Sequence, residues 1–374
     1  MTSITTWPRP ARSRPTTPTS SWCCSDAERS GWEGILCLVL WVRGPYISGM
    51  SSPRLCLALL CAFGSMASAS AAIDIIEADA VKKVITIETN APADVVRYTL
   101  DGRDPDYSAG VYLAPIELPE GGTVKAAVFV EQKRVGPVVS KSLPVSPSEL
   151  PNPAKVPLTQ NRDHRVYDWV QRHEAILALN KSGAAATKVV LVGDSITHFW
   201  SGEPKSTRVA GALSWDKYIA PHAPLNLGYG WDRTENVLWR LRHGEVKGLR
   251  PKAFVVLIGT NNLNTNTVAE TVEGIEAVCA EIRTQSPGAK ILLLGLLPRG
   301  ERPDAMRQKV AEVNSMLVTR APKICDRYLD LSARFIQPDG RITRAIMSDF
   351  LHPTDAGYEF MGKAIDDALK AWGL

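Results

Sequence analysis

Residues 189–197 read Val-Val-Leu-Val-Gly-Asp-Ser-Ile-Thr, and this stretch decides how the second half of the chain folds. Its apolar start predicts a buried strand that ends at Gly193, with Ser195 in the tight turn beyond it. Open α/β sheets carry their reactive groups at the carboxyl ends of strands, so Ser195 lies where a nucleophile is expected. We expect Asp194 to hold the turn by accepting backbone N–H groups. Gly, Asp and Ser are ordinary turn residues, so Ser195 needs partners elsewhere in the chain.

From residue 161 onward, apolar runs of strand length alternate with stretches of helical periodicity. This alternation predicts a parallel sheet of five main strands with helices on both faces and right-handed crossovers, a doubly wound α/β fold. The predicted strands are 188–193, 224–227, 253–258, 290–296 and about 324–329, and the predicted helices are 164–179, 232–243, 267–285, 304–319 and 354–372.

His352 is the predicted partner of Ser195. The chain has six histidines, and His352 alone has an aspartate, Asp349, three residues before it. Pro353 keeps His352 out of a helix interior. Asp349 can then bond one ring nitrogen and fix the tautomer, so that the other nitrogen can take the serine proton. The alternative is that Asp349 caps a helix and His352 is a surface loop residue.

The other histidines are weaker candidates for the base. His198 lies on the same turn as Ser195 and should point elsewhere, while His222 lies in a proline-flanked loop. We interpret His164, His173 and His243 as residues on the solvated surface. The basic run from Arg240 to Lys252 and the spacing of Asp232 and Glu235 are likewise typical of a solvated face and a helix start.

Acyl transfer also needs hydrogen-bond donors for the charge that develops on the carbonyl oxygen. Gly228 follows a short apolar run, and without a side chain its N–H could approach a substrate closely. Asn261 follows the predicted buried strand 254–258. Turn chemistry explains each motif taken alone. Their shared position at the edge of the sheet that carries Ser195 favours a role in binding the oxyanion.

In order along the chain, residues 193–197, Gly228, 259–261 and 349–352 resemble the four sequence blocks of the SGNH (GDSL) hydrolase family. Residues 226–241, and Arg250-Pro251-Lys252 before 259–262, are most similar to the platelet-activating-factor acetylhydrolase α-subunit branch. The resemblance covers about residues 187–372 and implies a flavodoxin-like strand order. It implies that Ser195 is the nucleophile, His352 the general base and then acid, and Asp349 the residue that orients His352. It also implies an oxyanion hole made of the Ser195 and Gly228 N–H groups and the Asn261 side-chain amide.

Three residues depart from the family pattern. Asn262 stands where many members have aspartate, outside the catalytic set. Tyr229 and Trp231 replace smaller residues around the glycine, so the shape of the acyl pocket does not carry over from the branch.

Residues 73–145 predict a small β-sandwich, because short strand-like runs at 84–89, 95–100 and 124–130 are separated by turn residues. Residues 98–105, 112–116 and 122–126 resemble the chitobiase/β-hexosaminidase C-terminal-type domain, a fibronectin-like module that accompanies carbohydrate-active enzymes. A spacer without a binding site is an equally good interpretation. The proline-rich stretch 146–160 predicts a semi-rigid linker to the catalytic domain, 161–374.

Residues 50–72 have the basic start, short apolar centre and small-residue end of a secretory signal peptide, which predicts a secreted or periplasmic protein. The apolar centre is too short to span a bilayer, and nothing supports a lipid anchor. We interpret residues 1–49 as a mis-called extension before Met50, with a disordered N-terminus as the alternative. Only Cys279 and Cys325 follow the signal peptide. No disulfide or metal-ligand spacing is present, so we expect free thiols, no metal and no cofactor.

These features predict a serine esterase that removes short acyl groups, acetyl foremost, from a carbohydrate or polysaccharide. The net charge of +4 is small and gives no case for nucleic acid or an anionic membrane as partner. The alternatives are a short-chain acylhydrolase that acts on lipids or phospholipids, and a sugar-binding protein without catalysis on the same scaffold. The oligomeric state, the regiochemistry and the glycan are not predicted.

Overall fold

The computed structural model describes residues 73–90, 95–144, 152–160, 163–164, 167–183 and 186–374. The predicted signal peptide and the segment before it lie outside these residues. All described residues fall in one of the two units into which the chain divides, the unit 66–374.

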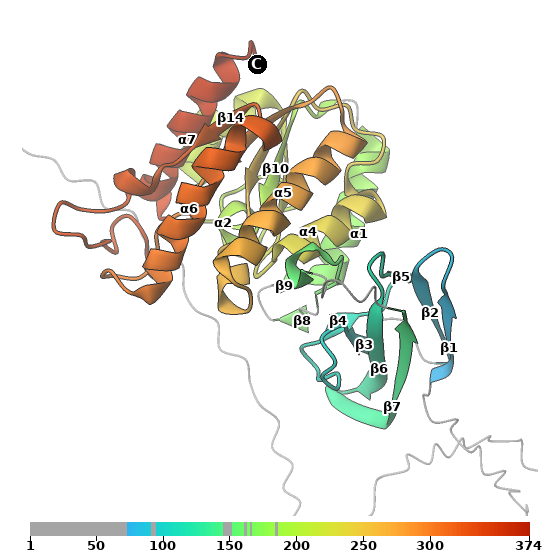
Figure 1. Cartoon of the computed structure of the whole chain (residues 1–374). Coiled ribbons are helices and arrows are strands. Elements are labelled where there is room, and N and C mark those ends of the chain that lie inside the picture. The colour runs from blue at the N-terminus through green and yellow to red at the C-terminus, as the bar shows by residue number, and fades with distance from the viewer. Residues whose placement is uncertain (1–72, 91–94, 145–151, 161–162, 165–166, 184–185) are drawn as a thin grey trace, which may run out of the picture. The chain divides into compact units, whose positions relative to one another are not determined.

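A five-stranded parallel sheet forms the centre of the second half of the chain (Figure 1). Its strands are β10 (Val189–Gly193), β11 (Pro224–Gly228), β12 (Ala253–Leu257), β13 (Lys290–Leu294) and β14 (Arg327–Leu329). They lie in the order β11-β10-β12-β13-β14, and each neighbouring pair is parallel. The chain thus starts inside the sheet, steps to one edge and then returns across it, which confirms the flavodoxin-like order.

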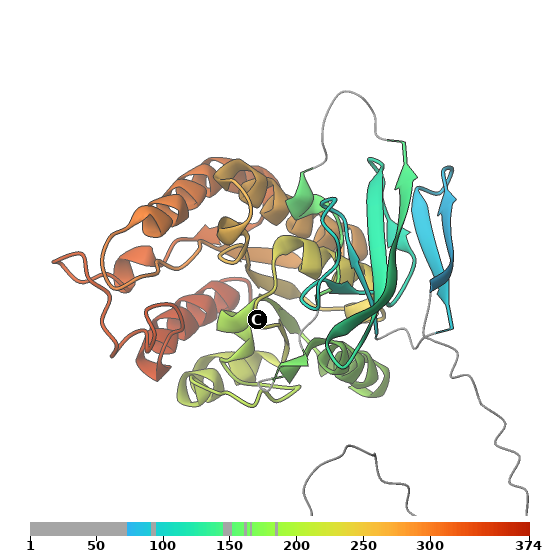
Figure 2. The same ribbon diagram turned by 90° about the horizontal axis from the view of Figure 1, so that it is seen from below.

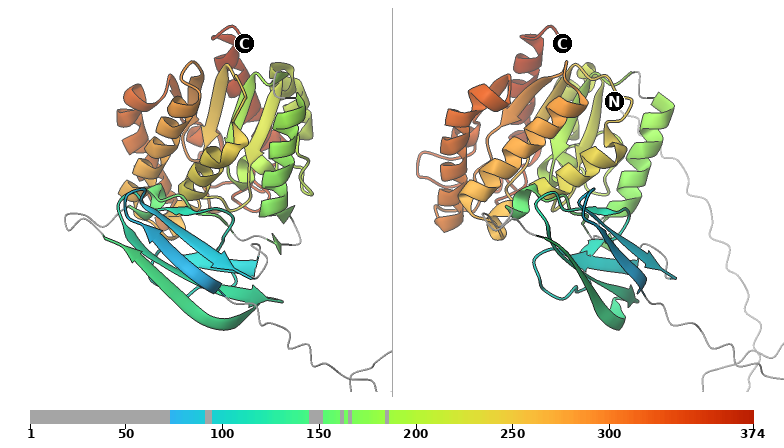
Figure 3. Two further views of the ribbon diagram at one scale, coloured as in Figure 1. Left: turned by 90° about the vertical axis from the view of Figure 1, so that its right-hand side faces the viewer. Right: turned by 45° about the vertical axis from the view of Figure 1, so that its right-hand side comes forward.

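Helices cover both faces of this sheet. They are α1 (Trp169–Gly183), α2 (Ser195–His198), α3 (Ala212–Ser214), α4 (Thr234–Arg240), α5 (Val268–Gln285), α6 (Ala305–Ile324) and α7 (Asp355–Lys370). Helices α4, α5 and α6 lie in a row on one face (Figure 3), and α7 lies on the opposite side with α3 (Figure 2). The predicted helix 164–179 begins later, at Trp169, where Asp168 Oδ1 accepts the Gln171 N–H at 2.8 Å.

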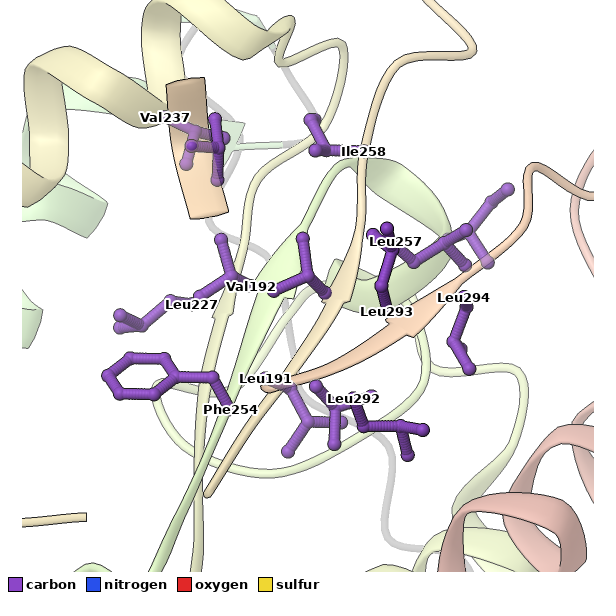
Figure 4. Packing of buried hydrophobic residues seen from close by; sticks show 14 of the residues in the cluster. Leu191, Val192, Leu227, Val237, Phe254, Leu257, Ile258, Leu292, Leu293 and Leu294 are labelled. Atoms are coloured by element: carbon purple, nitrogen blue, oxygen red, sulfur yellow. The ribbon is translucent and has the colours of Figure 1, made fainter. Parts of the chain in front are cut away.

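The strands are apolar on both sides because both faces of the sheet are buried. Leu191 and Leu292 are in register with Val255 and lie on one side of the sheet, whereas Val192 faces Val237 of α4 on the other (Figure 4). All five side chains are at most 3% exposed. Burial of this kind supplies the main driving force for folding and fixes the strand ends that carry the site.

Residues 73–143 form two antiparallel sheets, in the orders β1-β2-β5 and β4-β3-β6-β7. The strands are β1 (Ile73–Asp79), β2 (Val84–Thr89), β3 (Val96–Thr99), β4 (Gly110–Val111), β5 (Ile116–Glu117), β6 (Gly122–Val130) and β7 (Lys133–Leu143). Ile85, Val96 and Val124, from both sheets, share one core, so this part is the expected β-sandwich. Strands β1, β4, β5 and β7 are additional to the three predicted runs.

The described part of the predicted linker, 152–160, is held by hydrogen bonds to the α/β part. A short 3₁₀ turn covers Pro153–Lys155, and Asn152 Nδ2 donates to the carbonyl oxygen of Glu270 at 3.1 Å. Asn236 Nδ2 of α4 donates to the Leu158 carbonyl at 2.8 Å. Beyond it, β8 (Asp163–His164) pairs with β9 (Tyr167–Asp168).

Candidate active site

Ser195 opens α2 directly after β10, in a turn that only glycine at position 193 allows. A Cβ on Gly193 would lie 2.2 Å from Thr197 Oγ1 and 2.5 Å from the Leu257 carbonyl oxygen. Asp194 caps α2, and its Oδ1 accepts the Ile196 N–H at 2.9 Å, the turn-holding role expected for it. This packing fixes the serine against the ends of β10 and β12.

The structure brings Ser195, His352 and Asp349 together, although 157 positions in the sequence separate Ser195 from His352. His352 Nε2 lies 2.8 Å from Ser195 Oγ, and His352 Nδ1 lies 2.7 Å from Asp349 Oδ2. The other carboxylate oxygen of Asp349 accepts the N–H groups of His352 at 2.7 Å and Leu351 at 3.2 Å. Asp349 therefore accepts the Nδ1 proton, and Nε2 is left to accept the Ser195 hydroxyl proton.

Burial lowers the pKa of His352 below its ordinary value, against the opposing effect of Asp349. For Asp349, burial raises the pKa, but the hydrogen bonds from the backbone and ring of His352 outweigh it and lower the value. The pair at neutral pH is thus a neutral imidazole beside a carboxylate, the state that a general base requires.

Arg208 is a neighbour of this pair that sequence reasoning missed. Its Nη2 lies 3.6 Å from Asp349 Oδ2, and its guanidinium lies over the ring of Phe199, 4.8 Å from the centroid. The Phe199 ring in turn lies 5.2 Å from the His352 ring. Because Arg208 comes from a loop far from residue 349 in sequence, no spacing signal connects them.

The structure corrects the role predicted for Gly228. Its single N–H donates to Asn226 Oδ1 at 2.8 Å in the protein interior, and a Cβ there would lie 2.3 Å from the His198 backbone nitrogen. The glycine therefore lets β11 pack against the backbone of α2, and its N–H has a partner other than substrate.

Asn261 and Ser195 retain donors for an oxyanion. Asn261 Nδ2 donates one hydrogen to the Asp232 carbonyl at 3.0 Å, and an amide carries a second. Ser195 is the first residue of α2, so its N–H has no acceptor within that helix. Their roles as oxyanion donors stay predictions.

A buried ion cluster lies beneath Asn261. Arg240 Nε lies 2.8 Å from Asp232 Oδ2, and the Arg240 guanidinium also binds Glu245. Glu245 accepts from the Tyr229 hydroxyl and lies 2.8 Å from His173 Nδ1. Burial raises the pKa of Asp232 to about 6, against the opposing effect of Arg240. Through the Asp232 carbonyl, this cluster positions the Asn261 amide.

The interpretation as solvated surface residues is therefore wrong for Arg240 and His173, whereas the other basic residues of the run are exposed as expected: Arg242, Lys247, Arg250 and Lys252. Arg240 is fully buried, His173 is 6% exposed, and His243 stacks on Trp239 with ring centroids 3.8 Å apart. Helix α4 is capped at Arg233, whose N–H donates to Asn236 Oδ1, so Asp232 does not start the helix. Arg240 is buried because it pairs with Asp232 and Glu245, which local sequence does not reveal.

The remaining histidines do not reach the serine. His198 is buried and accepts the Gly230 N–H, and burial lowers its pKa to about 2. His222 Nε2 lies 2.8 Å from Asp366 Oδ1. The side chain of His164 lies outside what the structure describes. Among the histidine side chains described, His352 alone bonds Ser195.

Buried beside the nucleophile, Asp194 has a pKa raised to about 7, chiefly by burial. Its Oδ2 is buried without a hydrogen-bond partner among the described residues.

The thiols of Cys279 and Cys325 are free, and burial raises the pKa of both. Among the described residues, no three side chains of the metal-binding types gather into a site, and no helix is long and apolar enough to cross a bilayer.

Two parts of the chain match known protein families, and matches to named relatives cover more than half of the chain. Residues 191–360 match the model of the GDSL-like lipase/acylhydrolase family, and residues 85–143 match a family described as Fn3 associated. The α2 subunit of platelet-activating factor acetylhydrolase IB from Rattus norvegicus is 37% identical over 219 residues, which cover 58% of this chain and 90% of that protein. The human α1 subunit is 32% identical with the same coverage.

Solved structures with a similar arrangement include a putative acylhydrolase from Bacteroides fragilis, which is 23% identical with a TM-score of 0.44 and covers 55% of this chain and 98% of its own. A carbohydrate acetylesterase from Sinorhizobium meliloti is 16% identical with a TM-score of 0.37, covering 50% and 99%. From the sequence matches, this chain belongs to the GDSL-like lipase/acylhydrolase family and is a hydrolase that acts on esters.

Proposed function

We propose that the protein removes short acyl groups, acetyl foremost, from a carbohydrate or polysaccharide through an acyl-enzyme on Ser195. The observation that carries the acyl-enzyme is the 2.8 Å contact between Ser195 Oγ and His352 Nε2, together with the 2.7 Å contact between His352 Nδ1 and Asp349. A serine with an oriented imidazole beside it is an activated nucleophile.

The reaction follows from these positions. Ser195 Oγ attacks the ester carbonyl carbon while His352 Nε2 takes the hydroxyl proton, and Asp349 stabilises the imidazolium that forms. The tetrahedral oxyanion would face the Asn261 amide and the Ser195 N–H. When the C–O bond breaks, His352 gives its proton to the leaving alcohol. Water, deprotonated by His352, then releases the acid and restores the Ser195 hydroxyl.

The choice of acetyl rests on the relatives, which are named as acetylhydrolases. The choice of a carbohydrate rests on two sequence features. These are the Fn3-associated region 85–143 and the signal-peptide pattern of residues 50–72. We propose a secreted or periplasmic location on the second feature. Determining the N-terminus of the protein exported by an expression host tests it, with cleavage after Ala69 or Ala72 as the expected result.

The second candidate is a short-chain acylhydrolase of phospholipids, because the same relatives are named for platelet-activating factor. Acyl-chain profiles separate the two only in part, since both release acetate. Acetyl release from acetylated xylan and from an acetylated phospholipid should therefore be measured on the same preparation.

The experiment that tests the proposed function is a series of p-nitrophenyl esters from acetate to decanoate, with Ser195→Ala as the control. We expect the highest kcat/KM on acetate, a steep fall with chain length, and loss of this activity in Ser195→Ala. A maximum at long chains would refute the acetyl preference. Acetyl release from the phospholipid but not from the xylan would favour the second candidate.

A further inference from the structure

A cavity of about 510 Å³ borders Asn261 and extends to the β-sandwich. Its walls come from the end of β3 and the loop after it, from the segment 153–160, from residues 231–236 and from residues 261–266. This volume is in the range of small-ligand sites. Asn261, a predicted oxyanion donor, and a loop of the β-sandwich thus share one cavity.

Hydrogen bonds hold the segment between these walls on both sides. The Leu158 N–H donates to the Glu235 carbonyl at 3.2 Å, and Thr159 Oγ1 donates to the Val111 carbonyl. The Thr159 N–H also donates to the buried Tyr98 hydroxyl at 3.4 Å. The cavity is therefore framed by ordered backbone.

Trp231, an aromatic residue of the cavity wall, has an unusual backbone conformation. The residue is 39% exposed, and its φ of 61° lies in the left-handed region, where a bulky side chain is strained. Such strain persists where the surroundings impose it, often at ligand sites. Here the neighbouring Asp232 is locked in the ion cluster with Arg240.

The rest of the lining suits hydroxyl groups. Asp101 and Arg103 form a bonded pair at 2.8 Å in the loop after β3, and Arg233 Nη1 donates to Thr265 Oγ1 at 3.2 Å. Carboxylates, guanidinium groups and amides bind hydroxyls directionally, while an indole offers a flat apolar face. A long alkyl chain would take water away from these charged groups and offer them no hydrogen bonds in return, which is unfavourable.

We propose that this cavity binds the sugar units next to the acetylated one, with Trp231 as a stacking platform and the 101–108 loop as a source of hydrogen bonds. The inference rests on the proposed function and adds to it that the β-sandwich takes part in substrate selection. Its ligand is an acetylated oligosaccharide that extends from Ser195 past Asn261.

The test compares Trp231→Ala and Arg103→Ala with the unaltered chain on p-nitrophenyl acetate and on a panel of acetylated xylose, glucose and mannose oligosaccharides. For at least one oligosaccharide we expect kcat/KM to fall in Trp231→Ala at least 10-fold further than for p-nitrophenyl acetate, mainly through KM. Arg341→Ala, in an exposed pair with Asp339 away from the cavity lining, is the control and should leave this ratio unchanged.

Measuring oligosaccharide binding in a variant without the nucleophile tests the cavity independently of catalysis. Calorimetric titration of Ser195→Ala with the same oligosaccharides should show binding that Ser195→Ala/Trp231→Ala weakens at least 10-fold. If the unaltered chain hydrolyses p-nitrophenyl acetate but both cavity variants keep its ratio on every oligosaccharide, the inference is overturned and the esterase stands. If the unaltered chain shows no Ser195-dependent hydrolysis, the proposed function fails and the inference with it.

Discussion

His352 is the residue on which the proposed chemistry depends most, because it contacts both the nucleophile and the orienting carboxylate. Its surroundings act on its charge in opposite directions. Burial and the cation of Arg208 disfavour the imidazolium, while Asp349 favours it, and the net effect is a lowered pKa. At neutral pH the imidazole is therefore uncharged and can accept the Ser195 proton.

We therefore predict that kcat/KM for p-nitrophenyl acetate rises with pH as His352 loses its proton. The midpoint should lie below about 6.5, the ordinary value for histidine, with a plateau between pH 7 and 8. Acetate release measured by chromatography from pH 4.5 to 8 checks this. Arg208→Gln removes a nearby cation and should move the midpoint upward. A midpoint above 6.5 in the unaltered chain would contradict the electrostatics described here.

Asn261 gives a second prediction at this scale. Asn261→Ala removes the side-chain donor, so kcat on a short ester should fall on the order of 10²-fold or more, with a smaller change in KM. Steady-state kinetics measure this, and thermal unfolding of the same variant shows whether the fold is kept. A folded variant with kcat within threefold of the unaltered chain would remove Asn261 from the oxyanion hole.

Among the elements, the ends of the parallel strands carry the candidate active site, and the buried ion cluster around Arg240 supports the turn after β11. Arg240 of α4 is fully buried between Asp232 and Glu245, and its guanidinium lies 3.9 Å from the centroid of the Tyr229 ring. Two carboxylates in the interior are tolerated because each of them forms an ion pair with this cation. The cluster joins the β11–α4 turn to α1 through His173.

Arg240→Met should consequently lower the free energy of unfolding by about 3–5 kcal/mol, because it leaves two buried carboxylates without their cation. Urea denaturation followed by far-UV circular dichroism measures the loss. Arg242→Met is the matched control, since Arg242 is partly exposed and pairs with Glu281 and Glu117 at 2.9 Å. It should cost about 1 kcal/mol or less. Equal losses in the two variants would show that the cluster does not support the fold in this way.

Elements with strong local signals were predictable. The strand 189–193 and the turn at Ser195 follow from an apolar run that stops at glycine, and the pair Asp349 and His352 follows from spacing within one loop. Gly228 shows the limit of this reasoning. A glycine at a strand end indicates that something approaches its backbone, but only the fold shows that α2, and not a substrate, lies there.

At the scale of the whole molecule, the fold class was predictable because alternating strands and helices permit few topologies. The contacts of 152–160 were not, since five prolines between 144 and 160 indicate an extended segment and say nothing of its partners. Nor did the sequence indicate that the loop after β3 and the Asn261 turn share a cavity. Both features arise from contacts between residues far apart in the sequence, such as Leu158 with Asn236.

Covalent labelling by an organophosphate p-nitrophenyl ester shows directly whether Ser195 is the nucleophile. Ser195 Oγ should attack the phosphorus and release p-nitrophenolate, leaving a phosphoryl group that peptide mass spectrometry finds on Ser195. We expect one label per chain, at Ser195, with loss of esterase activity in step and much slower labelling in His352→Ala. A label on another residue, or esterase activity that survives full labelling of Ser195, would contradict this expectation.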